Sequence, residues 1–161
     1  MEPALEKGRK VRREIRRAGP EELDAAYGIV EEYYEAVRVV ARESREKFAH
    51  DYFAAAAGVW LAWANGQIAG CIALRALHMA KTAEIKRMYV RPAWRGLGIA
   101  QGLLDEAERF AEKKGYQWIY LDTTDGMVEA AQLYRRNGYE LCARYNDNPQ
   151  ATIFMRKRLE S

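Results

Sequence analysis

A chain of 161 residues is long enough for one globular domain with a sizeable core and too short for two comfortable ones. Hydrophobic residues make up 49% of the chain and charged residues 30%, proportions that exclude a disordered or fibrous protein. The formal net charge of +3 is modest, so the basic runs are expected to be solvated faces, and no nucleic-acid partner is predicted.

Targeting signals and cysteine residues further narrow the classes of protein to which the chain can belong. No apolar run approaches the roughly 18 residues of a transmembrane helix, and the N-terminus lacks the apolar segment of a secretion signal. We therefore expect a cytoplasmic protein with no membrane partner, with residues 1–8 as a flexible lead-in and residues 9–161 as a single domain. Cys71 and Cys142 each lie in an apolar run, which favours buried thiols over a disulfide or a zinc site, and no metal is predicted.

The first half of the chain predicts a strand, a helical region and a hairpin. The expected elements are a strand over 11–16, one helix or two over 20–40, an ambiguous stretch over 42–57, and strands over 58–63 and 67–75. Gly28 is the expected break in the helical region. Asn65-Gly66 is a strong hairpin signal, so the two strands that it joins are expected to pair antiparallel.

The second half alternates strands and helices. The expected elements are a strand over 82–90, a helix over 97–114, a strand over 117–123, a helix over 127–136, and strands over 139–145 and 151–159. Pro92 cannot donate to a strand ladder, so it ends the strand before it, and Gly115 ends the long helix. The order of elements predicts a mixed α/β (α+β) layer structure rather than a doubly wound sheet.

The most informative motif is the loop Arg95-Gly96-Leu97-Gly98-Ile99-Ala100, at the start of the long helix. Glycine allows the backbone a positive φ, and the first turn of a helix leaves N–H groups unpaired. The loop therefore predicts a seat for a phosphate or pyrophosphate. Two other interpretations stay open at this point. One is a dinucleotide site with Asp122 on the ribose, although the third glycine is displaced by one position, and the other is a helix that happens to begin with two glycines.

The residues around this loop resemble a known family. The run Glu84–Ala100 is similar to the acetyl-CoA signature of the GNAT superfamily of N-acetyltransferases, often written R-G-x-G-x-G/A. The positions that fill this pattern are Arg95, Gly96, Gly98 and Ala100. The resemblance, which is to small bacterial members, extends over residues 58–159. One departure is Met127, where many members carry an Asn that contacts the cofactor.

The resemblance implies a fold and a donor. The GNAT fold is a mixed, mostly antiparallel sheet of about seven strands flanked by about four helices. The donor is acetyl-CoA, with its pyrophosphate on the glycine loop and its pantetheine arm beside the end of the preceding strand. The residues expected to bind it are Met88, Tyr89, Val90, Arg95, Gly96, Leu97, Gly98, Ile99, Ala100 and Gln101. The backbone N–H of Met88 is expected to face the thioester oxygen as it gains charge.

The resemblance also implies two catalytic residues. Glu84 is the candidate base, because an amine must lose its proton before it can attack. The alternative role for Glu84 is a salt bridge with Lys81, Lys86 or Arg87. Tyr134 matches the tyrosine that serves as general acid in the family, and the alternative there is a packed tyrosine on a helix face. Direct attack needs no metal and no covalent nucleophile.

The acceptor is the open part of the prediction. We expect an N-acetyltransferase acting on a primary amine of a small molecule or amino acid. Arg75 and Arg87 are expected to hold an acceptor carboxylate, unless they form surface ion pairs instead. Two alternatives stay open: a protein acetyltransferase acting on lysine or N-terminal amines, and a non-catalytic acetyl-CoA-binding sensor module. Pairing of the apolar stretch Thr152–Met155 between two copies would give a homodimer.

Overall fold

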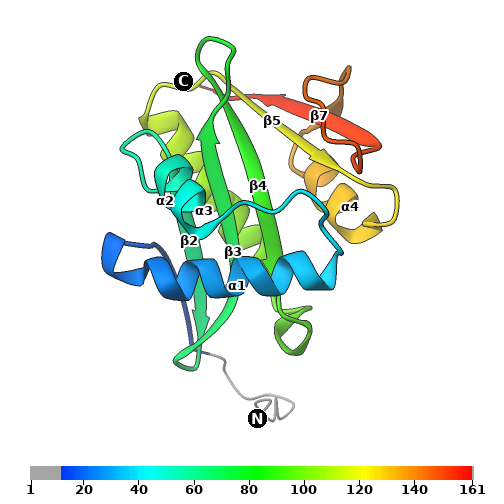
Figure 1. The fold of residues 1–161 in the computed structure, drawn as a ribbon. Coiled ribbons are helices and arrows are strands. Elements are labelled where there is room, and N and C mark those ends of the chain that lie inside the picture. The colour runs from blue at the N-terminus through cyan, green and yellow to red at the C-terminus, as the bar shows by residue number, and fades with distance from the viewer. Residues whose placement is uncertain (1–11, 161) are drawn as a thin grey trace.

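Seven strands form one sheet in the order β1-β2-β3-β4-β5-β7-β6 in the computed structural model, which describes residues 12–160 (Figure 1). The strands are β1 (Arg13–Arg17), β2 (Gly58–Ala64), β3 (Gln67–Ala76), β4 (Thr82–Val90), β5 (Trp118–Thr123), β6 (Glu140–Leu141) and β7 (Ile153–Arg158). Neighbouring strands are antiparallel except β4 and β5, which run parallel. The prediction of a mixed, mostly antiparallel sheet is confirmed.

Helices cover both faces of the sheet. The α-helices of the described residues are α1 (Leu23–Ala36), α2 (Arg45–Tyr52), α3 (Ile99–Lys113) and α4 (Val128–Arg136). α1 and α2 pack on one face, and α3 lies behind the strands on the other (Figure 1). Side chains of β2 alternate between the two cores, with Val59 and Leu61 on the α1 side and Trp60 against Phe110 of α3. Because both faces are covered, β2 is an almost continuous apolar run.

The hairpin and the start of the long helix follow the sequence signals closely. Asn65 and Gly66 have φ values of 49° and 80°, as a tight hairpin turn between β2 and β3 requires. β4 ends at Val90, and Pro92 begins a short 3₁₀ turn, η2 (Pro92–Trp94). α3 begins at Ile99 and lays its buried face on β2 and β3. These elements fix the position of the glycine loop relative to the sheet.

The helical region before the hairpin differs from the prediction. A 3₁₀ turn, η1 (Pro20–Glu22), leads into α1, which runs without a break through the exposed Gly28. A Cβ at Gly28 would meet no atom within 4 Å, so this glycine is not needed for packing. The break comes after Ala36, where residues 37–44 form a loop that contains Arg38 with a φ of 54°. We call this stretch the α1–α2 loop.

The predicted strand over 139–145 is wrong in length. Only Glu140–Leu141 forms a strand, followed by a hydrogen bond from the Cys142 N–H to the Phe154 carbonyl. The chain then leaves the sheet, because Tyr145 turns its hydroxyl to the buried Glu84 carboxylate. Residues 142–152 therefore form a connection between β6 and β7, which we call the β6–β7 loop.

Three other expectations concern the ends of the chain and its cysteines. The lead-in over 1–8 and Val11 lie outside the described residues, and the described part of the first strand is β1. β7 lies inside the sheet, between β5 and β6, so its main chain is not a free edge for the pairing that was expected over Thr152–Met155. Cys71 is buried and Cys142 half-buried, and both are free thiols.

Residues 12–160 contain neither a membrane-spanning helix nor a cluster of metal-ligating side chains. None of their helices is long and apolar enough to cross a membrane. The same residues contain no group of three or more His, Cys, Asp or Glu side chains placed to hold a metal ion.

Candidate active site

β4 and β5 separate after four paired positions. Their parallel pairing runs from Thr82↔Trp118 to Ile85↔Leu121, whereas β4 continues along β3 as far as Val90. Within the described chain, no strand pairs with 86–90 on the β5 side. Apart from the carbonyls of Arg87 and Val90, which accept from the side chains of Cys71 and Arg95, main-chain groups on this side of β4 are therefore available to a ligand that lies alongside the strand.

A β-bulge lies in the separated part of β4. Between the pairs Lys86↔Ala73 and Tyr89↔Cys71, two residues of β4 oppose one residue of β3. Arg87, the first residue of the bulge, has a φ of 58°, a left-handed conformation that residues with a long side chain rarely adopt. The Cys71 thiol lies against this bulge and donates to the Arg87 carbonyl at 3.2 Å. Such strained positions are concentrated at functional sites, where the surrounding structure holds them.

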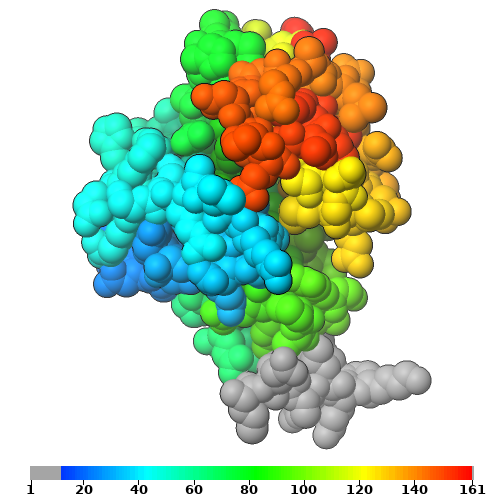
Figure 2. Space-filling view, turned by 45° about the vertical axis from the view of Figure 1, so that its right-hand side comes forward, coloured from blue at the N-terminus to red at the C-terminus, as the bar shows by residue number. Residues whose placement is uncertain are grey.

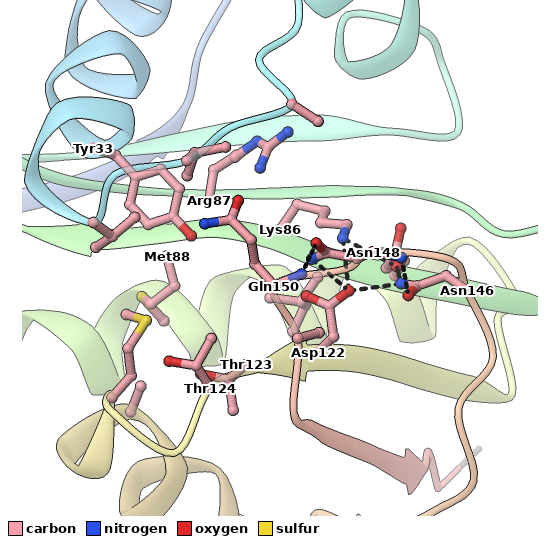
Figure 3. A pocket seen from close by; sticks show the side chains of 18 of the residues that line it. Tyr33, Lys86, Arg87, Met88, Asp122, Thr123, Thr124, Asn146, Asn148 and Gln150 are labelled. Atoms are coloured by element: carbon pink, nitrogen blue, oxygen red, sulfur yellow. Dashed lines mark hydrogen bonds and ion pairs between the residues drawn. The ribbon is translucent and has the colours of Figure 1, made fainter.

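A pocket of about 1090 Å³ opens beside the separated strand. Its walls come from the end of α1, the α1–α2 loop, β4, the residues after β5, α4 and the β6–β7 loop. In Figure 3, Tyr33 of α1 and Met88 of β4 point into the pocket, across from Thr124. The pocket brings together these predicted site residues: Arg75, Glu84, Arg87, Met88 and Tyr134.

Glu84 is buried at the floor of the pocket, with 1% of its surface exposed. Its Oε1 accepts from Nε of Arg75 at 3.2 Å. Its Oε2 accepts from the Tyr145 hydroxyl at 2.7 Å and from Nδ2 of Asn146 at 3.3 Å, with Nζ of Lys86 at 3.4 Å. The salt bridge to Lys86 that was considered for Glu84 is therefore present, and Arg75 is its second cationic partner rather than Lys81 or Arg87.

Asp122, near the end of β5, is a second carboxylate of the pocket, and its side chain is 9% exposed. Its Oδ2 accepts from Nζ of Lys86 at 3.0 Å, from Nδ2 of Asn146 at 2.6 Å and from Nδ2 of Asn148 at 3.4 Å (Figure 3). Burial alone would raise the pKa of Asp122, but Lys86 and the two amide donors outweigh it and hold that pKa below its usual value. Asp122 thus ties the β6–β7 loop to the end of β5.

Arg75 and Arg87 both line the pocket, and both are paired with carboxylates. Arg87 Nη2 lies 2.8 Å from Oε1 of Glu43, which comes from the α1–α2 loop. Arg75 Nη1 lies 3.3 Å from Asp51 and 3.7 Å from Glu43, in addition to the contact of Arg75 with Glu84. These are partly buried ion pairs rather than the surface pairs considered from the sequence. Their charge is already balanced by the protein, which weakens the case for an acceptor carboxylate bound at these two arginines.

Tyr134, on α4, is 4% exposed and packs its ring edge-on against Tyr139. Burial raises the pKa of the Tyr134 hydroxyl above its usual value, and Tyr33 and Asp122 add to the shift. The hydroxyl therefore stays protonated through the neutral and mildly alkaline range, as a proton donor to a leaving group must. The packed and the acid roles are compatible, because Tyr134 also lines the pocket.

The glycine loop has the backbone that the motif predicts. Gly96 and Gly98 have φ values of 81° and 78°, and Gly98 is the N-cap residue of α3. A Cβ at Gly96 would meet no atom within 4 Å, so the backbone conformation, rather than space, favours glycine there. No side chain caps the start of α3, which leaves its first N–H groups available to an anion. The residues present thus fit a pyrophosphate.

Side chains near this loop are placed differently from the prediction. Nε of Arg95 donates to the Val90 carbonyl at 2.8 Å, and so the side chain braces the loop against β4. Gln101 exchanges hydrogen bonds of 2.8 and 3.0 Å with the side-chain amide of Asn137, the residue at the C-terminal end of α4. The side-chain amide of Gln101 is therefore already hydrogen-bonded within the protein. Arg13 of β1, which the sequence did not single out, donates to the Leu97 carbonyl and adds positive charge at the loop.

The sequence missed the residues that build the pocket walls. Lys86 and Asn146 bridge the two carboxylates, and Asn148 donates to Asp122 alone. Glu43 pairs with Arg87 across 44 positions of the chain. The pattern Asn-x-Asn, between the two strands predicted over 139–145 and 151–159, is a visible signal for ordered loop geometry. The identity of the partners was not visible, because they lie tens of residues away.

Comparisons with known proteins agree with this geometry. The sequence profile of the Acetyltransferase (GNAT) family matches residues 23–139. The chain belongs to this family. Among its relatives, an uncharacterized N-acetyltransferase of Schizosaccharomyces pombe is 36% identical over 93 residues, which cover 57% of each chain. An uncharacterized N-acetyltransferase of Bacillus subtilis is 33% identical over 105 residues, covering 62% of this chain and 68% of the relative.

A solved GNAT structure shows the same fold. An acetyltransferase of the GNAT family from Staphylococcus aureus superposes with a TM-score of 0.79 at 21% identity, covering 92% of this chain and 100% of the other. The sequence match reaches little more than half the length of the S. pombe relative. Family and fold of this GNAT protein are therefore established, whereas the acceptor is a matter for proposal.

We expect Asp122→Asn to destabilise the protein by about 1–3 kcal/mol at pH 7, because Lys86 and two amide donors lose an ionised acceptor. A carboxylate with a lowered pKa contributes stability that is present above its unfolded value of about 3.9 and is lost as pH falls through its folded value. Urea unfolding from pH 7 to pH 3 should therefore show the difference from wild type shrinking below about pH 4.

The matched control is Asp125→Asn, at an exposed carboxylate that follows β5. It should change the free energy of unfolding by less than about 0.5 kcal/mol. Equal stabilities of the Asp122 and Asp125 variants at pH 7 would contradict the anchoring role of Asp122.

Proposed function

We propose that this GNAT protein is an N-acetyltransferase that moves the acetyl group of acetyl-CoA to a primary amine of a small molecule or amino acid. The observation that carries the proposal is the early separation of β4 from β5. It leaves unpaired main chain between the glycine loop at one end and the Glu84 and Tyr134 side chains at the other. Family membership supports the same chemistry.

The donor would lie along β4. Its pyrophosphate would accept hydrogen bonds from the loop 95–101, where two left-handed glycines and the uncapped start of α3 present N–H groups. Its pantetheine amides would pair with the main chain of Met88, Tyr89 and Val90. In this arrangement the Met88 N–H faces the thioester carbonyl, where charge develops during attack. The bulge at Arg87 changes the direction of the backbone groups next to that position.

Glu84 would receive the proton of the acceptor amine. A lysine-like amine has a pKa of about 10.4 in water, so at neutral pH it must lose a proton before attack. Both Glu84 oxygens are already engaged by protein donors, of which the Tyr145 hydroxyl is nearest, at 2.7 Å. A relay through a water molecule or through Tyr145 suits this crowding better than direct contact with the amine.

Tyr134 would protonate the leaving group. The amine nitrogen forms a bond to the acetyl carbon, the carbon–sulfur bond breaks, and the electron pair leaves on the CoA sulfur. The sulfur takes the Tyr134 proton, while the proton lost by the amine goes through the relay to Glu84. The products are an amide and free CoA. Counted from the ammonium form, the nitrogen loses two protons, one before attack and one from the tetrahedral adduct, and both leave through the relay and Glu84 to solvent. The tyrosine takes one proton back from solvent, so one proton is released per turnover.

The test of the transfer is release of free CoA thiol from acetyl-CoA in the presence of a panel of amines. In this assay we expect Tyr134→Phe to lower kcat by about 10²-fold, since a positioned general acid contributes that much. Because burial raises the Tyr134 pKa, the wild-type kcat should not fall between pH 8 and about pH 10 through ionisation of this residue.

Tyr116→Phe is the matched control for this variant, because the Tyr116 hydroxyl bonds the Ala56 carbonyl away from the pocket. It should keep wild-type turnover. A loss of less than about fivefold in Tyr134→Phe would contradict the acid role. CoA binding without thiol release from any amine would instead favour the sensor interpretation.

We expect Glu84→Gln to lower kcat/KM by about 10²-fold at pH 7, with the deficit shrinking as pH approaches the pKa of the amine. The reason is that free amine becomes abundant at high pH and needs no protein base. Glu108→Gln serves as control, since Glu108 is also a partly buried carboxylate paired with a tyrosine and a lysine, Tyr139 and Lys157. Activity of Glu84→Gln within twofold of wild type at every pH would exclude Glu84 as the base.

A further inference from the structure

Two loops that lie far apart in the sequence meet over the pocket through one side chain. Nε2 of Gln150, in the β6–β7 loop, donates to the Arg38 carbonyl at 3.0 Å. Its Oε1 accepts from the Val40 N–H at 2.9 Å. Both the nitrogen and the oxygen of the side-chain amide therefore form hydrogen bonds with the α1–α2 loop. We call this pair of hydrogen bonds the Gln150 bridge. Figure 2 shows the orange-red β6–β7 loop reaching the cyan α1–α2 loop, with a hollow beneath.

The β6–β7 loop presents Gln150 from an ordered backbone. Oδ1 of Asn146 accepts from the Asn148 N–H at 3.1 Å, and Oδ1 of Asn148 accepts from the Gln150 N–H at 3.1 Å. The side-chain amides of both asparagines also donate to Asp122, which anchors these two successive turns to β5. Arg144 fastens the loop from its other side, by donating to the carbonyls of Asn146, Asn148 and Ala151. Gln150 is thus fixed in place by the same carboxylate that organises the pocket floor.

The α1–α2 loop is held equally firmly on the other side. Arg42 donates to the carbonyls of Val39 and Tyr34, and Glu43 pairs with Arg87 of β4. Arg38, whose carbonyl accepts from Gln150, has a φ of 54°. A left-handed backbone conformation costs free energy in a residue other than glycine, and the Gln150 bridge helps to hold Arg38 in it. The Gln150 bridge therefore joins two braced loops and closes a gap between them.

Both loops line the same pocket, where Val37, Val39 and Glu43 face the stretch Asn146–Ala151. The pocket, about 1090 Å³ in all, has to hold the acetyl end of the donor as well as the acceptor. A polypeptide acceptor continues past its reacting amine in one or two directions and needs an open groove for that chain. The bridge spans the place where the two loops would otherwise leave such a groove.

We infer that Gln150 is a specificity-determining residue that closes the acceptor pocket to polypeptides and admits the amine of a small molecule. This inference rests on the proposed function, because it takes the pocket to be the acceptor site. Removal of the bridge should widen the range of acceptors without weakening the donor site, since the glycine loop lies at the other end of β4.

The experiment uses bisubstrate conjugates, in which CoA is joined through an acetyl linker to an amine. One conjugate carries butylamine, one a pentapeptide through a central lysine, and one a pentapeptide through its N-terminus. Titration calorimetry of the full chain should show wild type binding the butylamine conjugate at least about tenfold more tightly than either peptide conjugate. In Gln150→Ala and in Gln150→Met, which keeps the bulk but not the hydrogen bonds, this ratio should fall below about threefold.

Two further measurements separate the possible failures. CoA alone should bind wild type, both Gln150 variants and the control Gln67→Ala, at the exposed start of β3, with affinities within twofold of each other. Amide hydrogen exchange at Val40 should accelerate in the Gln150 variants and stay unchanged in the control.

Equal binding of the peptide and butylamine conjugates by wild type would overturn the inference and leave the proposed function standing. An unchanged ratio in variants whose Val40 exchange has accelerated would overturn it as well, since the bridge would then be open without effect. Failure of CoA itself to bind wild type would overturn the proposed donor site, and the inference with it.

Discussion

The separation of β4 from β5 is the constraint on which the rest of the site depends. Parallel pairing stops at Ile85↔Leu121, and beyond it the β5 side of β4 has no strand partner among the described residues. Such unpaired main chain is costly unless a ligand or water satisfies it. The separation also leaves room between the strands for the pocket, and the carboxylates of Glu84 and Asp122 line it where the two strands part.

Those two carboxylates connect the fold to the site. A buried charge is tolerated only when it is paired and hydrogen-bonded, and Glu84 and Asp122 share Lys86 and the Asn146 amide. Their cationic partners, Arg75 and Lys86, come from the sheet, whereas the uncharged donors come from the β6–β7 loop. The carboxylates therefore also hold that loop in position over the pocket. Glu43 does the same for the α1–α2 loop through Arg87. Ion pairs and hydrogen bonds to these carboxylates therefore hold both of the loops that line the pocket.

The sequence predicted best those features that are decided locally. Asn65-Gly66, Pro92 and the glycines before α3 act through their own backbone preferences, and each lies where it was expected. Gly28 was misleading, because the packing of α1 on the sheet overrides the low helix propensity of one glycine. The predicted strand over 139–145 failed because a long-range contact, from Tyr145 to Glu84, takes the chain out of the sheet. Pocket partners of this kind depend on the fold and have no local signal.

We propose that the glycine loop and the separated part of β4 form one donor site. The most direct test is titration of ¹⁵N-labelled protein with CoA, which binds without turnover. We expect the amide signals of 96–101 and of Met88–Val90 to shift together along a single binding curve, while those of the hairpin at Asn65-Gly66 stay fixed. Shifts that avoid the loop and β4, or no shift at millimolar CoA, would contradict the account.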